Sequence, residues 1–487
     1  MPAYNWRVVG PFQGGTIRFQ YGLLDGVPSV NLDAFYTLDP RSSRNWPPYG
    51  ELVSSGQVSG LVAAGEPLAH KVVINVIQYL YFYGDHAHAA DLATRAHADW
   101  NRRAGEADSQ TLSAARYLGL CLWALGRYAE AEEVNQRVLE LCRRQFPESP
   151  DTIIAELRVA VDLRTRGMFT VARKLNEQLY ARAHERFTAD HPITLQTAHD
   201  LAAVTRLCGD YRRSLEVNAR TSETRARVFG EDSPDTLNTL SGVYVDRLEL
   251  GEYQAALQGH ALVANRVRET LGLAKDAPDM LRRCTYLAVA KRKAGDHAGA
   301  LELSGRTLEL YRRRYESLPH PSLLACAVGH VTDLRYAGRL DDARELGEQT
   351  VRQYRETLGE NHPFTLAAIA NYAVLQRITG DVAGARELND RTLRKFQGAL
   401  GADHPHAIAC GINLGSDRAA LGEIDSAVAT GAAAIGRAER VLGPDHPITC
   451  AARQNLELDQ LAGRRSGDEG SASGGERANI DVDPLPL

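Results

Sequence analysis

The feature that most constrains this chain is a period of about 42 residues that runs through most of its length. A proline recurs at intervals of 42 to 44 residues. Its positions are Pro150, Pro192, Pro234, Pro278, Pro321, Pro363, Pro405 and Pro447. A fixed period of this size indicates an array of stacked supersecondary units, because one such unit cannot bury its apolar face alone.

A second column keeps the same period inside each unit. A glycine recurs at intervals of 41 to 44 residues, and a small residue follows it five places later, as in Gly380 and Ala385. The glycines are Gly84, Gly126, Gly167, Gly209, Gly251, Gly295, Gly338, Gly380 and Gly422. A glycine after an Ala- and Leu-rich segment is a typical helix stop, and a small residue lets the next helix pack closely. Each unit is therefore predicted to be a helix pair with a tight turn.

The start of each unit reads as a helix start. Proline fits the first turn of a helix, and an Asp or Asn before His-Pro is expected to cap it. The pattern predicts an all-α solenoid of about nine helix pairs over residues 65–462. A last helix, at about residues 447–462, has no partner and is expected to cover the final apolar face.

The repeat resembles a tetratricopeptide repeat (TPR) of the 42-residue kinesin-light-chain type. The shared marks are the His-Pro-x-Thr openings at 191–194, 362–365 and 446–449, and the first-helix segments 371–373 and 413–415. The resemblance implies a right-handed superhelix whose concave surface is lined by the first helix of each pair. It says little about function, since repeat folds serve many partners.

Residues 1–64 do not fit the repeat. They are rich in Gly, Pro and aromatic residues, and the segments 6–9, 16–21 and 29–32 read as short strands. Residues 45–49 read as a loop. We expect this irregular, β-containing segment to dock on the first repeat through Trp46, Tyr49 and Leu52.

The same segment resembles the end of a winged-helix module joined to repeats in bacterial NB-ARC/TPR signalling ATPases. Such proteins carry a P-loop, whereas this sequence has no G-x-x-x-x-G-K-[ST]. Nucleotide hydrolysis is therefore not implied for this chain.

Residues 463–487 change in composition. They are rich in Gly, Ser and charge, and they end in acidic, aliphatic and proline residues, so a disordered tail is expected. This ending resembles that of the tetratricopeptide component of FxSxx-COOH peptide-modification systems. The tail is long enough to fold back, so self-occupancy of the groove and self-association both stay open.

The overall composition argues against several classes of protein. The net charge is −5, which does not favour nucleic-acid or acidic-membrane binding. Seven scattered cysteines without a C-x-x-C pair suggest reduced thiols and a cytoplasmic location. No apolar run reaches 18 residues, so no membrane-spanning helix is expected.

Two polar columns mark the first helices. Nine places before the turn glycine stand Asn75, Asp200, Asn371 and Asn413. Three places before it stand Arg164, Arg206, Arg292, Arg335 and Arg377. An Asn amide can pair with the main chain of an extended peptide, and Arg can hold carboxylates. The alternative is structural: each Arg pairs with the next helix, and each Asn satisfies a loop carbonyl.

These features predict a protein–protein interaction scaffold that binds an extended, acidic peptide or protein tail in the concave groove. No catalytic motif, metal site or cofactor site is visible, so no enzyme activity is expected. The alternative function is the sensor arm of a STAND-type (NB-ARC) signalling system whose ATPase part is absent or separate.

Overall fold

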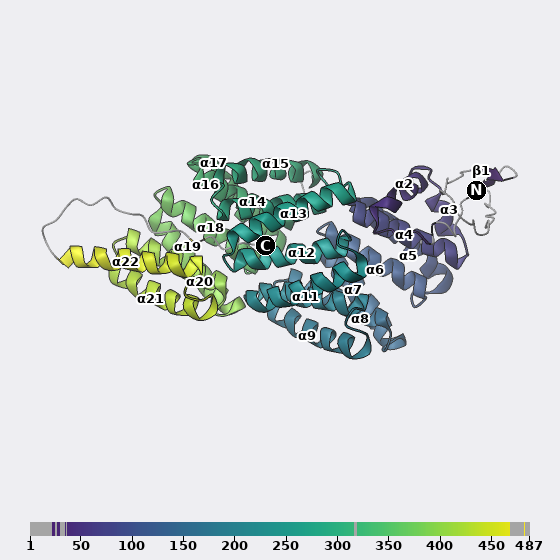
Figure 1. Cartoon of the computed structure of the whole chain (residues 1–487), viewed down its shortest axis with the longest axis horizontal. Helices are drawn as coiled ribbons and strands as arrows, with labels where there is room; N and C mark the ends of the chain where they lie inside the picture. Colours follow the sequence, from purple (N-terminus) through teal and green to yellow (C-terminus); the bar gives the residue numbers. More distant parts are fainter. Residues whose placement is uncertain are drawn as a thin grey trace.

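The computed structural model describes residues 22–24, 27–29, 35, 37–315, 319–467 and 482. Figure 1 shows an elongated helical body with α2–α5 at one end and α21 and α22 at the other. The first helices of the pairs are α4 (Pro67–Tyr83), α6 (Ser109–Ala124), α8 (Pro150–Thr165), α10 (Pro192–Leu207), α12 (Pro234–Glu249), α14 (Pro278–Lys293), α16 (Pro321–Tyr336), α18 (Pro363–Ile378) and α20 (Pro405–Ala420). The second helices are α5 (His86–Ala104), α7 (Tyr128–Gln145), α9 (Phe169–Arg186), α11 (Tyr211–Phe229), α13 (Tyr253–Leu271), α15 (His297–Tyr315), α17 (Leu340–Leu358), α19 (Val382–Leu400) and α21 (Ile424–Val441).

The two columns have the roles that the sequence predicts. The turn glycines all have positive φ, for example 75° at Gly167 and 101° at Gly380. The small residue five places later is buried without exposed surface in every pair, from Ala89 to Ala427. The all-helical repeat architecture is confirmed; the right hand of the superhelix stays a prediction.

The helix caps differ from the expected pattern in one respect. In all five His-Pro starts the capping residue is the histidine itself, not the Asp or Asn before it: the Nδ1 atom of His362, for example, accepts the main-chain N–H of Phe364 at 3.1 Å. His191, His320, His404 and His446 accept the equivalent main-chain N–H in the same way. Histidine can do this because its unprotonated ring nitrogen is an acceptor.

The first helices form the inner layer of the superhelix. Most successive first helices touch one another directly, as α4 and α6, α14 and α16, and α18 and α20 do, and α20 also touches the terminal helix α22 (Pro447–Gly467). Among the described residues, no two successive second helices of the nine pairs touch to a similar extent. The more closely spaced layer of a curved array lies on the inside of the curve, so the first helices line the concave face.

The superhelix closes on itself after five pairs. A Cβ added at Gly167, in the third pair, would lie 2.5 Å from Cδ of Pro363, which starts the eighth pair. Gly209 stands in the same relation to Pro405, again at 2.5 Å. The α4–α13 part is therefore a first turn, and the part from α14 to α22 is a second turn stacked on it.

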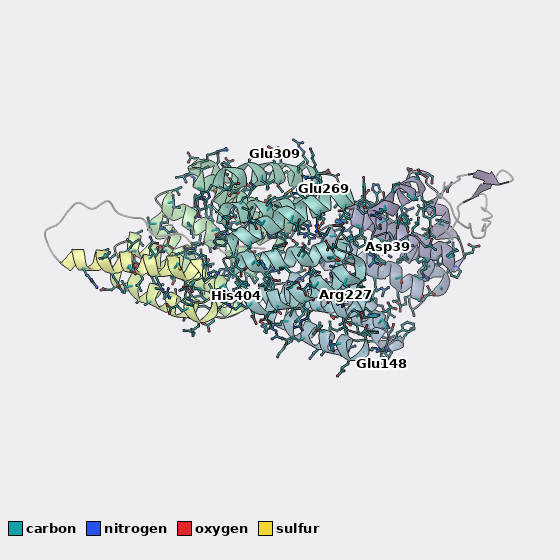
Figure 2. All side chains as sticks on the ribbon, viewed as in Figure 1. Asp39, Glu148, Arg227, Glu269, Glu309 and His404 are labelled. Carbon is teal, nitrogen blue, oxygen red and sulfur yellow. The ribbon has the colours of Figure 1, made fainter. Side chains whose placement is uncertain are left out.

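Histidines join the two turns. The ring of His362 uses Nδ1 for its own helix cap, so Nε2 carries the proton and donates to the carbonyl oxygen of Thr165, 3.1 Å away and 197 residues earlier. The equivalent bonds run from His320 to Ala124, from His404 to Leu207 and from His446 to Glu249, at 2.9 to 3.2 Å. We call these four histidines the seam histidines. His404 is labelled in Figure 2, where the second turn meets the first.

The N-terminal segment is more helical than expected. Residues 45–49 do not form a loop, because α2 (Trp46–Ser54) and α3 (Val58–Ala63) follow a 3₁₀ turn at Ser43–Asn45. Two strands, β1 (Gly22–Leu24) and β2 (Val27–Ser29), pair antiparallel. Of the predicted strands, 6–9 and 16–21 lie outside the described residues, and Ser29 alone of 29–32 is in a described strand.

The predicted docking of Trp46, Tyr49 and Leu52 is confirmed. All three are buried, and Tyr49 stacks on Tyr79 of α4 with ring centroids 5.5 Å apart. The segment also reaches the end of the first turn, since the Ser43 hydroxyl donates to the Thr270 carbonyl at 2.6 Å. The N-terminal segment therefore connects the two ends of the first turn.

Candidate functional site

The asparagine column lies on the inner face and is buried. Asn75, Asn371 and Asn413 occupy equivalent positions in α4, α18 and α20, and their exposed fractions are 9%, 6% and 0%. Asp200 has the same position in α10, and its carboxylate accepts the Gln196 amide at 2.9 Å. Burying a polar side chain is costly unless it forms hydrogen bonds, so the partners of these side chains matter.

Asn413 holds a peptide main chain. Its Nδ2 donates to the carbonyl oxygen of Val482 at 2.6 Å, and its Oδ1 accepts the N–H of Val482 at 3.0 Å. Val482 belongs to the C-terminal tail and is only 4% exposed. The tail was expected to be disordered from residue 463. The structure instead ends α22 at Gly467 and docks Val482 on the inner face.

Asn75 makes a weaker contact of the same kind at the opposite end of the array. Its Nδ2 donates to the main-chain carbonyl of Phe35 at 3.4 Å, and the Tyr49 hydroxyl donates to the same carbonyl at 3.2 Å. Phe35 is buried. Two members of the column, near the two ends of the chain, therefore contact main-chain groups of segments outside the array.

One member of the column was missed by the sequence analysis. Asn455 stands eight residues after Pro447, as Asn413 stands eight residues after Pro405, and it is buried in α22. The signal was visible in the sequence, but counting back from a turn glycine cannot find it, because α22 has no such turn. Three successive inner helices, α18, α20 and α22, thus carry Asn at one position.

The arginine column pairs mainly with the next inner helix. Arg377 donates to a carboxylate oxygen of Asp417 at 2.5 Å and to the main-chain carbonyl of Asn413 at 3.2 Å. Arg292 pairs with Asp333 at 2.7 Å, and Arg206 pairs with Asp246 at 3.0 Å. The structural alternative is therefore realised for these three arginines, while ligand contact by the column stays a prediction.

Two of these aspartates, Asp417 and Asp246, also accept a hydrogen bond from an asparagine of the second helix that precedes them. Asn389 of α19 donates to the other Asp417 oxygen at 2.6 Å, and Asn218 of α11 donates to Asp246 at 2.6 Å. Each aspartate stands five places before the turn glycine of its own pair, and each asparagine stands nine places after the turn glycine of the preceding pair. These columns were visible in the sequence, yet their meaning depends on which helices touch. The networks fix the spacing of the inner helices that present the asparagine column.

Two arginines of the column differ from the rest. Arg164 lies near Asp200, and burial lowers the pKa of its guanidinium. Arg335 lies over the ring of Tyr336 at 5.3 Å. The column is interrupted in the second pair, where Trp123 replaces Arg. Asp162, on the next inner helix α8, accepts a hydrogen bond from the Asn135 amide at 2.9 Å, and burial raises its pKa to about 6.

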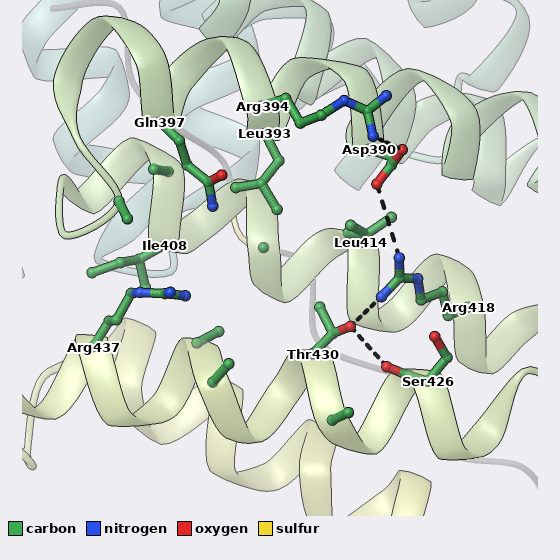
Figure 3. Close-up of a pocket in the computed structure, with 16 residues that line it drawn as sticks. Asp390, Leu393, Arg394, Gln397, Ile408, Leu414, Arg418, Ser426, Thr430 and Arg437 are labelled. Atoms are coloured by element: carbon green, nitrogen blue, oxygen red, sulfur yellow. Dashed lines mark hydrogen bonds and ion pairs between the residues drawn. The ribbon is translucent and has the colours of Figure 1, made fainter.

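Two recesses lie away from the asparagine column. One, of about 400 Å³, lies between α19, α20 and α21, where Ala429, Ala433 and Gly411 leave space. Figure 3 shows Arg418 at its edge, bonded to Thr430 and facing Asp390. The other, of about 430 Å³, lies at the seam beside Gly209 and His404. Cys208, Asp210 and His404 all line the second recess, but both ring nitrogens of His404 already form hydrogen bonds and burial raises the pKa of the Cys208 thiol.

Titratable groups do not gather into a metal site in the part of the chain that the structure describes: no group of three His, Cys, Asp or Glu could hold a metal ion there. The seam histidines are separated by whole repeats. Burial raises the pKa of the Cys121 thiol to about 12, so that thiol is not a nucleophile at neutral pH. Among the described helices, none is both long and apolar enough to cross a bilayer.

Comparison with known proteins agrees with the repeat assignment. One tetratricopeptide repeat model matches residues 110–185 and 323–397, and a second matches residues 194–235 and 408–448. No curated protein matches the chain. The matched segments lie in both turns of the superhelix.

Several solved structures are similar to this chain at low sequence identity. A Rap protein complexed with competence and sporulation factor is 11% identical, with 73% of this chain and 100% of that chain covered and a TM-score of 0.51. A putative kinesin light chain repeat protein from Podosopora anserina is 22% identical (44% and 100% covered, TM-score 0.34). A STAND protein with a tetratricopeptide repeat sensor from Pyrococcus horikoshii is 13% identical (76% and 55% covered, TM-score 0.40). From the repeat geometry and the family models we conclude that this chain carries tetratricopeptide repeats.

Proposed function

We propose that this protein is an interaction scaffold that binds an extended segment of a protein along the inner face of α18, α20 and α22. The observation that carries the proposal is the pair of hydrogen bonds between Asn413 and the main chain of Val482. The asparagines of this column are the proposed contacts to the main chain of the ligand.

The geometry of that pair favours an extended ligand. In an extended chain the N–H and C=O of one residue point to the same side, which is how residues exchange two bonds across an antiparallel ladder. The amide of Asn413 engages both groups of Val482, as a neighbouring strand would. A helical ligand would have its main-chain groups occupied by its own bonds.

The repeat supplies the same group on neighbouring helices. Asn371 and Asn455 stand beside Asn413 on α18 and α22, one per inner helix. Helices in contact lie about 8–10 Å apart, and an extended chain rises about 3.3 Å per residue. A ligand would therefore pass one asparagine about every three residues.

The proposed preference for acidic ligands rests on the charge of the tail. Asp481 and Asp483 flank Val482 in the sequence, and Arg377 lies on the neighbouring inner helix. Because Arg377 already pairs with Asp417, its proposed role is to position α20. The STAND sensor alternative and a cytoplasmic location stay predictions.

The test is selection of random dodecapeptides on phage, with the full chain carrying Val482→Asp as bait. That substitution places a carboxylate where an isopropyl group is buried and should free the inner face. Peptides should be enriched, and they should lose binding to a bait that also carries Asn371→Asp and Asn413→Asp. Failure to enrich any peptide, or equal binding to both baits, would overturn the proposal.

A further inference from the structure

The last pair of the array is built with smaller side chains than the pair before it. At 8, 12 and 16 places after the turn glycine, α19 carries Leu388, Thr392 and Phe396. The equivalent residues of α21 are Thr430, Ala434 and Ala438. Since protein interiors are close-packed, lost side-chain volume is either filled by another group or left as a cavity.

An aliphatic residue from outside the array takes part in this core. Val482 belongs to one apolar cluster with buried side chains of α20, α21 and α22. The other members are Ile408, Ala409, Ile412, Ala434, Ala438 and Ala452. Burying a valine side chain in this way is worth about as much as burying any core aliphatic residue, so the contact favours occupancy as well as orientation.

The site therefore recognises two features of the segment that it binds, the main chain of one residue and the side chain of that residue. Asn413 takes the N–H and C=O of one residue, and the apolar cluster takes the side chain of that residue. Arg377 holds the Asn413 main chain from α18, which keeps the amide in place. A branched aliphatic residue in an extended segment meets both requirements.

We propose that this site is the docking point for an aliphatic residue of an extended, acidic partner segment, and that the chain's own Val482 occupies it as an intramolecular competitor. The inference rests on the function proposed above and adds to it the chemistry of the ligand and its regulation. Val482 lies in the sequence Ile-Asp-Val-Asp-Pro. This sequence indicates the pattern that we expect in the ligand, an aliphatic residue between two carboxylates.

The length of the connection makes such competition effective. Fourteen residues, 468–481, with several Gly and Ser, separate the end of α22 from Val482. A short tether of this composition gives an effective concentration on the order of 1 mM. A segment with a Kd of about 0.1 mM would then weaken an external ligand roughly 10-fold, and one with a Kd of about 0.01 mM roughly 100-fold.

The experiment uses a fluorescein-labelled peptide with the sequence of residues 476–487 and the full chain, with anisotropy as the readout. Val482→Asp should strengthen peptide binding about 10- to 100-fold over the unchanged chain. The matched control, Val482→Ile, keeps a branched aliphatic residue and should bind the peptide as weakly as the unchanged chain.

A second pair of variants locates the bound peptide. In the Val482→Asp chain, Asn413→Asp keeps the side-chain shape but removes the donor to the ligand carbonyl, so peptide affinity should fall about 10-fold. Asn265→Asp, on the exposed side of α13, should leave the affinity unchanged. Equal affinities for these two variants would move the peptide away from Asn413 and overturn the inference.

The outcomes separate the two proposals. If neither this peptide nor any selected dodecapeptide binds the Val482→Asp chain, the inner-face function is wrong, and this inference fails with it. If peptides bind that chain and the unchanged chain equally, the competitor role alone is wrong. A loss of thermal stability in Val482→Asp without any gain in affinity, or a concentration-dependent dimer abolished by Val482→Asp, would also overturn competition within one chain.

Discussion

The two turns of the superhelix use the same helix pair but cap their inner helices differently. In the first turn the caps of α6, α8, α10 and α12 are Asp108, Ser149, His191 and Ser233. In the second turn the four seam histidines precede α16, α18, α20 and α22. His191, in the first turn, caps α10 and stacks on Phe187 with ring centroids 4.3 Å apart.

The difference shows how one motif can serve two purposes. A Ser or Asp cap satisfies N–H groups of its own helix. A histidine cap does so with one nitrogen and has a second, proton-bearing nitrogen that reaches further. In the second turn, that nitrogen donates to a main-chain carbonyl of the first turn. One ring therefore supports both the cap of its own helix and the stacking of the two turns.

The largest expected effect is a loss of stability on acidification, because the contact between the two turns depends on the seam histidines. Burial lowers the pKa of His320, His362 and His404 to about 4, below the ordinary value of 6.5. Such groups stabilise the fold above pH 6.5, and that stability is lost as the pH falls from 6.5 towards 4. At pH 5 the loss should be about 2 kcal/mol for each histidine. Urea unfolding between pH 7.5 and 5 measures it.

The control for acidification replaces these three histidines by Asn, which still caps the helices. That variant should be less stable at pH 7.5, and its stability should change much less between pH 7.5 and 5. An unchanged pH dependence would assign the acid sensitivity to other buried groups, such as His199 and His260, whose pKa burial also lowers.

Gly167→Ala should be the most damaging single substitution at the seam. Its φ of 75° strains any residue with a Cβ, and that Cβ would lie 2.5 Å from Pro363. Gly380 has the same place in its repeat and φ of 101°, but nothing lies within 4 Å of its added Cβ. We expect a loss of about 4 kcal/mol for Gly167→Ala and about 1 kcal/mol for Gly380→Ala by urea unfolding. Equal losses would mean that the two turns of the superhelix can move apart at Gly167 without a loss of stability.

An Asp→Asn substitution in the column of aspartates should destabilise the fold in the second turn and stabilise it in the first. Asp417→Asn removes the buried charge that Arg377 needs and should cost about 3 kcal/mol. Asp162 has no ion-pair partner among the described residues. Its pKa is raised from 3.8 to about 6, so its contribution to stability is lost as the pH rises from 3.8 to 6 and stays lost at pH 7.5. Asp162→Asn should therefore add about 1 kcal/mol at pH 7.5. Thermal melting at pH 7.5 and 5 measures both, and the gain from Asp162→Asn should shrink at pH 5.

The smallest effect should come from single histidines. His362→Asn keeps a helix cap but loses the bond to the Thr165 carbonyl, which predicts a loss of about 1 kcal/mol. His191→Asn should change stability by a few tenths of a kcal/mol, because the Asn caps α10 equally well. Chemical denaturation can resolve this difference. A similar loss at both positions would remove the distinction between the turns.

Much of the fold was readable from the sequence because its signals are local. Gly380 and Ala385 specify a turn and a close helix crossing within one repeat, and both behave as predicted. Residues 45–49 were misread because Trp46-Pro47-Pro48 resembles a loop, yet proline is also favoured in the first turn of a helix, and α2 begins there.

The site was only partly readable. The position of Asn413 was predicted, but its contact with Val482 was only one of several open possibilities, since the two residues are 69 positions apart. Pairing of Arg377 with the next helix was one of two alternatives, while its partner Asp417 was not recognised, because an ion pair between repeats depends on the spacing of two helices.

The sequence by itself determined the helix pair, its turn and the number of repeats, because caps, glycine turns and apolar periodicity act over distances shorter than one repeat. Tertiary structure alone decided that the sixth pair lies on the first, that His362 meets Thr165, and that the tail meets Asn413. The physical reason is that each pair adds a small rotation and rise, which side-chain packing sets. Contacts between residues 197 positions apart depend on the sum of these rotations and rises over five pairs.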